Sequence, residues 1–113
     1  MVNVTFYEDS RHRLSSFVGA GHVVIAGRSP DEYSMVCAAV SAILQAAAGG
    51  LEDHAGIRTA REIKRGRMRV RWPKTARGDA AVQAIVATAY LAIQQIAKQY
   101  PKYVRVTRRS ETG

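Results

Sequence analysis

The feature that most constrains the fold is an apolar repeat of helical period between Asp79 and Pro101. Asp79 is a suitable N-cap, and Pro101 cannot continue a helix. A helix with one apolar face has to bury that face against another layer. The apolar residues recur at intervals of three and four, which places them on one side of the helix: Val82, Ile85, Val86, Ala89, Ile93, Ile96, Ala97 and Tyr100.

The layer that covers such a helix is predicted to be a β-sheet. Four segments have the period or composition of strands, namely residues 2–7, 14–23, 68–73 and 103–107. The first two are joined by a short polar stretch and are expected to pair as a hairpin. In the third, Met68, Val70 and Trp72 alternate with Arg69 and Arg71, which gives one apolar and one basic face. Residues 51–66 are polar and are expected to be irregular.

A second helix is predicted through "VCAAVSAILQAAA", residues 36–48. One face is apolar, and Gly49-Gly50 is expected to weaken or end the helix. Two starts are possible. Ser29 would open a capping box with Pro30 as the first helical residue. Ser34 would be an N-cap directly before the apolar run. The apolar face comprises Val36, Val40, Ile43, Leu44 and Ala47.

The predicted fold class is α+β, with the element order β-β-α-β-α-β. One sheet and two helices on one of its faces would form a two-layer sandwich. We expect residues 1–113 to be a single domain, because the length suits one domain and 47% of the residues are hydrophobic. The chain has one cysteine, its N-terminal stretch does not resemble a signal peptide, and no uninterrupted apolar run reaches ~18 residues. A cytoplasmic location is therefore expected.

Cys37 is the only cysteine, and His22 precedes it across a stretch that contains Gly, Ser and Pro. A lone cysteine among small aliphatic residues is typical of a core position. The other interpretation is catalytic. The partial positive charge at a helix N-terminus favours the thiolate, and a histidine could take the thiol proton. The helix start decides between these environments. With Ser34 as the cap, Cys37 lies in the first turn; with Ser29 as the cap, it lies two turns inside.

No metal or cofactor site is expected. The three histidines, His12, His22 and His54, form no recognised zinc spacing with Cys37. The glycines of residues 19–21 form no phosphate-binding fingerprint.

The positive charge is local. Of the seventeen Lys and Arg residues, nine lie in residues 58–77, together with one acid. A solvated basic strand and loop would explain this segment. So would a nucleic-acid contact, with arginines on phosphates and Trp72 stacked on a base. A third explanation is a surface that brings the protein to RNA, where its substrate resides.

The segments "GAGHVV" and "VCAAVSAILQAAAGGLE" resemble the ribosomal-processing cysteine proteases of the Prp, or YsxB-like, family. The matching residues are Gly21, His22, residues 36–42 and residues 50–52, and "VTFY" at residues 4–7 is similar to the family's first strand. The resemblance implies a small homodimeric α/β sandwich without a cofactor. It also implies a Cys–His endopeptidase that removes the N-terminal extension of a large-subunit ribosomal protein, after a short hydrophobic and aromatic motif. Cys37 would be the nucleophile and His22 the general base, and the helix would start at Ser34, which puts Cys37 in its first turn.

The chain departs from the family pattern at two places. The stretch between His22 and Cys37 is about three residues longer, and Ser34 stands where the family has an acidic residue. A serine can replace a capping role but not a charge. Asp31 or Glu32 would then be the carboxylate that orients the histidine. With Gly21 and Ser41, these residues complete the predicted site. A non-catalytic RNA- or ribosome-binding module, and a relative that binds the precursor without cutting it, are the alternative functions.

Overall fold

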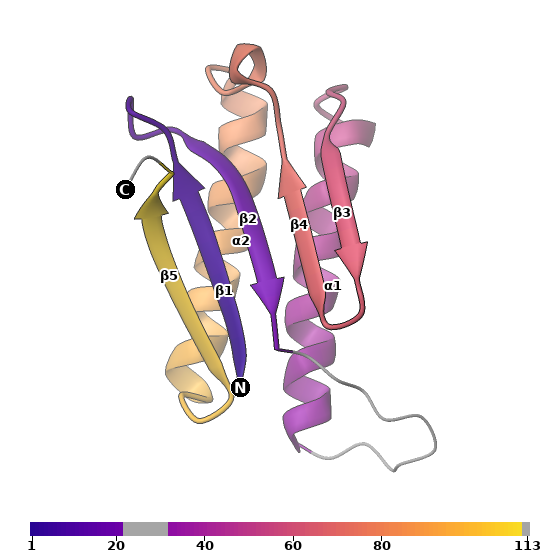
Figure 1. The fold of residues 1–113 in the computed structure, drawn as a ribbon, viewed down its shortest axis with the longest axis vertical. Helices are drawn as coiled ribbons and strands as arrows, with labels where there is room; N and C mark the ends of the chain where they lie inside the picture. The colour runs from indigo at the N-terminus through magenta and orange to yellow at the C-terminus, as the bar shows by residue number, and fades with distance from the viewer. Residues whose placement is uncertain (22–31, 112–113) are drawn as a thin grey trace.

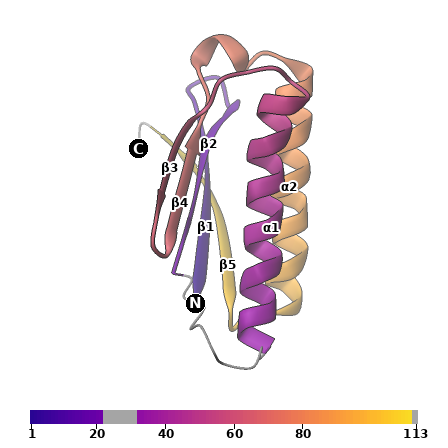
Figure 2. The ribbon, with the colours of Figure 1, turned by 90° about the vertical axis from the view of Figure 1, so that its right-hand side faces the viewer.

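The computed structural model describes residues 1–21 and 32–111, and Figures 1 and 2 show their arrangement. The sheet contains β1 (Val2–Glu8), β2 (Leu14–Ala20), β3 (Ala60–Lys64), β4 (Arg67–Arg71) and β5 (Val104–Ser110). Two helices, α1 (Glu32–Asp53) and α2 (Ala80–Gln99), lie side by side on one face of this sheet, and a short 3-10 turn, η1 (Lys74–Ala76), precedes α2. The predicted two-layer α+β sandwich is confirmed.

The strand order in the sheet is β3-β4-β2-β1-β5. The pairs β1–β2, β2–β4 and β3–β4 are antiparallel, and β5 pairs parallel to β1. The sheet is therefore mixed, with β3 and β5 at its edges. The helix-covered face carries the apolar residues of the central strands, and Phe6, Phe17 and Trp72 are fully buried between the sheet and the helices.

Helix α2 agrees with the prediction in position and in orientation. Asp79 is its N-cap, and the Asp79 carboxylate accepts hydrogen bonds from the backbone N–H groups of Ala81 and Val82. Val82, Val86, Ala89 and Ile93 are its buried residues, as the helical period requires.

Helix α1 differs from the prediction at both ends. It begins at Glu32, so Ser34 is inside the helix and is not its N-cap, and Cys37 lies in the second turn. The alternative start at Ser29 lies outside the described residues. At the other end, the helix continues through Gly50 to Asp53. A Cβ at Gly50 would lie 3.5 Å from Ile85 of α2, so packing against the second helix offsets the low helix propensity of glycine.

The prediction that residues 51–66 are irregular is wrong, because β3 occupies residues 60–64. All five residues of β3 are exposed. Apolar alternation therefore could not reveal the strand. Its extended conformation is stabilised by pairing with β4 across a turn at Arg65-Gly66. Gly66 has a φ of 76°, a conformation that favours glycine in a hairpin turn. Two other strand boundaries also differ. β5 extends to Ser110, beyond the predicted segment 103–107, and β2 ends at Ala20, before the end of the predicted segment 14–23.

Both helices are long and apolar enough, by length and composition, to cross a membrane. The core helices of soluble proteins have the same properties. Here each helix contributes buried residues to the common core, such as Leu44 and Leu51 in α1 and Ile93 in α2.

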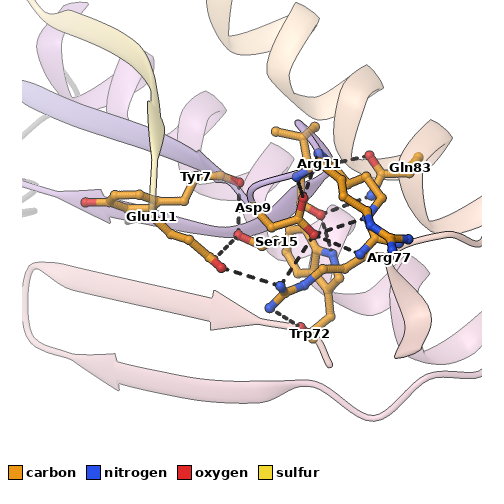
Figure 3. A network of polar contacts seen from close by, with 10 residues as sticks. Tyr7, Asp9, Arg11, Ser15, Trp72, Arg77, Gln83 and Glu111 are labelled. Carbon is orange, nitrogen blue, oxygen red and sulfur yellow. Dashed lines mark hydrogen bonds and ion pairs between the residues drawn. The ribbon is translucent and has the colours of Figure 1, made fainter. Parts of the chain in front are cut away.

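A buried polar network joins the β1–β2 turn, the end of β4 and the chain after β5 (Figure 3). The Arg77 guanidinium lies 3.6 Å from carboxylate oxygens of both Asp9 and Glu111, and it donates to the Trp72 carbonyl oxygen at 3.2 Å. Burial alone would raise the pKa of Asp9, but hydrogen bonds from Arg13 and Arg11 outweigh it and lower the pKa to about 2. These segments, distant in the sequence, are thus held together by charge-assisted contacts.

Candidate functional site

A pocket of about 200 Å³ lies between α1, the end of β2 and the β3–β4 hairpin. Its wall is mostly apolar, and the one cysteine of the chain is part of it. The lining residues are Val2, Gly19, Ala20, Cys37, Val40, Ser41, Leu44, Gln45, Ile63, Lys64, Gly66, Arg67 and Met68.

The helical side of the pocket is a row of residues at intervals of four along α1. Cys37, Ser41 and Gln45 follow one another on this side because residues four apart share a helix face. The Gln45 side-chain amide donates to the Ser41 hydroxyl oxygen at 2.9 Å. The Cys37 residue itself is only 1% exposed. Its thiol therefore sits in a mainly apolar wall, with polar side chains one and two turns further along.

The end of β2 forms the second side, and it depends on two glycines. A Cβ at Gly19 would lie 2.8 Å from Leu44, so the glycine permits close approach of α1. Gly21 has a φ of 96°, and a Cβ there would collide with the carbonyl oxygen of Met1. Its N–H donates to the Gly66 carbonyl oxygen at 3.1 Å, which joins the end of β2 to the hairpin turn.

The β3–β4 hairpin forms the third side. Ile63 is 67% exposed, which is unusual for a large aliphatic side chain, and it lines the pocket beside Met68 of β4. The two residues are direct partners in the strand register. Ile63, Gln45 and Met68 were not among the site residues predicted from the sequence. The available signal for the hairpin was Gly66, a turn residue just before the alternating residues 68–72.

The predicted site residues lie partly within the described structure. Cys37 and Ser41 line the pocket, Gly21 ends the β2 side, and Ser34 is one turn before Cys37 in α1. Glu32 is the first residue of α1. His22 and Asp31 lie outside the described residues, so the contact between the cysteine and the histidine stays a prediction. In residues 1–21 and 32–111, no three His, Cys, Asp or Glu side chains are grouped closely enough to hold a metal ion.

The proposed stacking role of Trp72 is wrong. Trp72 is 1% exposed, and its indole N–H donates to the Leu14 carbonyl oxygen at 2.8 Å. The arginines beside it on β4 lie on the opposite face of the sheet, as the strand period predicts.

By its fold, the molecule is a small two-layer α+β domain, and its distinguishing feature is one thiol in the wall of a pocket between helix and sheet. The model of the family described as cysteine protease Prp matches residues 1–105. The chain belongs to this family of cysteine hydrolases, and the resemblance seen in the sequence is confirmed.

Solved structures share this fold. SMU.848 from Streptococcus mutans is 25% identical, with a TM-score of 0.85 over 98% of this chain and 96% of that one. The essential ribosomal processing protease Prp from S. aureus, in complex with a substrate peptide, is 19% identical, with a TM-score of 0.81 over 96% of this chain and 99% of that one. The same S. aureus protease with a covalently linked product peptide is 20% identical, with a TM-score of 0.80 and the same coverage. No curated protein matches the chain.

Proposed function

We propose that the chain is a cytoplasmic cysteine endopeptidase that removes the N-terminal extension of a large-subunit ribosomal protein. Membership of the cysteine protease Prp family supports the reaction class. The ribosomal processing role of the S. aureus relatives, one bound to a substrate peptide, supports the substrate class. By the same resemblance, the working form is a homodimer.

The observation that carries this proposal is the position of Cys37 in the pocket wall. Ala20 lines the same pocket from the end of β2. His22 is two residues further along the chain, and two Cα–Cα steps of about 3.8 Å limit how far it can be from Ala20. The short chain link between Ala20 and His22 therefore supports a pairing of His22 with the Cys37 thiol, which a Cys–His dyad needs.

In the proposed reaction, His22 takes the proton of the Cys37 thiol, and the thiolate sulfur attacks the scissile carbonyl carbon. The C–N bond then breaks, and His22 returns the proton to the leaving amine. Water hydrolyses the remaining thioester and frees the thiol and the new carboxylate. Asp31 or Glu32 would orient the imidazole. Ser41, one helical turn after Cys37, adds a polar group to the same wall, and Gln45 donates a hydrogen bond to its hydroxyl oxygen.

The apolar wall indicates the kind of peptide that binds. Val40, Leu44, Ile63 and Met68 offer aliphatic and thioether surface to a hydrophobic or aromatic side chain. A short hydrophobic and aromatic motif before the cleaved bond fits this lining.

The reactivity of Cys37 tests this function against a purely structural cysteine and against a non-catalytic binding module. We expect iodoacetamide to alkylate the native protein with an apparent pKa well below the value of about 8.5 for a free thiol. His22→Gln should raise that pKa, while His54→Gln, outside the pocket, should not. A thiol that reacts only above pH ~8, or equally in both variants, would contradict the assignment. A degenerate relative would alkylate normally and leave a bound precursor peptide uncut.

A further inference from the structure

The face of the sheet that carries no helix is strongly basic. Strand register places its residues in rows, because alternate side chains of paired strands point to the same side. Arg71 of β4 is in line with Tyr7 of β1 and Arg109 of β5, and Arg67 is in line with Arg105. Figure 1 views the molecule from this face. We name it the open face, and its basic residues are Lys64, Arg67, Arg69, Arg71, Arg105 and Arg109.

Little negative charge balances these residues. Glu62 lies on the open face and is paired with Lys64 at 3.1 Å. Glu111, after β5, is engaged by the buried Arg77. Among the described residues, none of the arginines of the open face forms an ion pair. Unpaired arginines at this density repel one another, and an anionic partner would relieve that repulsion.

Basic residues of the open face line a groove that consists of two neighbouring hollows. A hollow of about 390 Å³ on the open face is lined by Tyr7, Ser16, Val18, Arg67, Arg69, Arg71 and Glu111. A second hollow, of about 770 Å³, lies beyond the end of β4, where Arg58 and Lys74 contribute positive charge and Arg77 is already paired with Asp9 and Glu111. The two hollows share the lining residues Arg71 and Glu111, so they are neighbours on the surface. Successive arginines along β4 are separated by about 6.6 Å, twice the rise per residue of a strand.

We propose that this groove binds the phosphate backbone of single-stranded RNA. A row of guanidinium groups suits the repeating charge of an extended strand. Tyr7 is the one aromatic side chain of the hollow, and Trp72 is buried, so base stacking contributes little and sequence selectivity is low. The choice of RNA over DNA rests on the proposed function, because a precursor of a ribosomal protein is found beside ribosomal RNA.

A second copy of this chain is a poorer partner for the open face. The protein has a formal net charge of +8, and pairing two open faces would bring like charges together. Cys37 lies on the helix-covered side of the sheet, so a peptide at the thiol and an RNA strand on the open face could bind together, although Lys64 of the open face also lines the cysteine pocket. Arg67 lines both cavities.

Fluorescence anisotropy with a labelled single-stranded RNA of mixed sequence, about 16 nucleotides long, tests this proposal. The test variant is Arg69→Gln with Arg71→Gln. The matched control is Lys98→Gln with Lys102→Gln, which removes the same charge from exposed residues at the end of α2. A second test variant, Arg105→Gln with Arg109→Gln, covers the case in which the first unfolds. Melting curves establish that each variant is folded.

Wild type should bind with a strong dependence on salt. Loss of two phosphate contacts should reduce the slope of log K against log salt by about 1.4, and affinity at 0.1 M salt by about 25-fold. The control should retain the wild-type slope. Equal losses in test and control variants, or no binding by wild type at 50 mM salt, would overturn the proposal. So would tighter binding to DNA of the same sequence, or a change of oligomeric state as the only effect of the test variants. Peptide cleavage, measured separately, tests the protease assignment.

Discussion

At the scale of single residues, Gly21 is the position where backbone geometry most clearly requires a glycine. Its φ of 96° is in the left-handed region, and a side chain there would meet the Met1 carbonyl oxygen. The residue ends the β2 side of the pocket, directly before His22. A change at this glycine should therefore affect both the fold and the reactive pair.

Gly21→Ala is expected to destabilise the protein by about 2 kcal/mol, since it adds backbone strain of ~1–2 kcal/mol and a steric conflict. It should also reduce peptide cleavage more than tenfold, because the end of β2 moves. Gly56→Ala is the matched control, with a φ of 68° and no atom near its Cβ. Urea unfolding and a cleavage assay measure both effects. If the two variants lose the same activity, Gly21 has no special link to the site.

At the scale of secondary structure elements, the β3–β4 hairpin contributes an exposed aliphatic side chain to the pocket. Ile63 is 67% exposed and lines the cysteine pocket, so its side chain is accessible to a peptide bound there. The hairpin would then act as a binding edge for the peptide while α1 supplies the thiol.

Ile63→Ser should raise KM for the peptide about tenfold, which corresponds to ~1.4 kcal/mol of lost apolar contact, and leave kcat nearly unchanged. Thermal stability should not fall, because the side chain is already in water. Leu91→Ser, at a residue of α2 that is 58% exposed and outside the pocket, is the control. An unchanged KM in Ile63→Ser would exclude the hairpin from substrate binding.

At the scale of the whole molecule, the network around Arg77 connects the β1–β2 turn, the end of β4 and the chain after β5. Asp9 has a pKa of about 2, below the ordinary 3.8, so its ionised form stabilises the fold above pH ~4. That contribution, about 2 kcal/mol, is lost as the pH falls from about 4 through 2.

Asp9→Asn should lower the free energy of unfolding by about 3 kcal/mol at neutral pH, because buried cations lose their partner. The difference from wild type should shrink at pH ~2, where about half of the wild-type carboxyl is also protonated. Urea unfolding at both pH values measures this. Glu62→Gln, at an exposed ion pair with Lys64, should leave the unfolding midpoint unchanged. A constant difference at both pH values would mean that the Asp9 charge is not the cause.

The sequence predicted the parts of the molecule that bury a periodic apolar face. Helix α2 and strand β4 are examples, since Val86 and Val70 mark faces that the core requires. Strand β3 has no buried residue, so only its partner strand defines it. The pocket could not be predicted, because its lining comes from β2, α1 and the β3–β4 hairpin, which meet only in the folded chain. The family resemblance identified Cys37, whereas residue chemistry alone favoured a core cysteine.

Cleavage of a precursor peptide by wild type and by Cys37→Ala tests the central claim most directly. The peptide carries the hydrophobic and aromatic motif of a ribosomal protein's N-terminal extension, and mass spectrometry identifies the products. We predict that wild type cuts one bond after the motif, while Cys37→Ala leaves the peptide intact and melts within a few degrees of wild type. Cleavage at the wild-type rate by the folded Cys37→Ala variant would contradict the account.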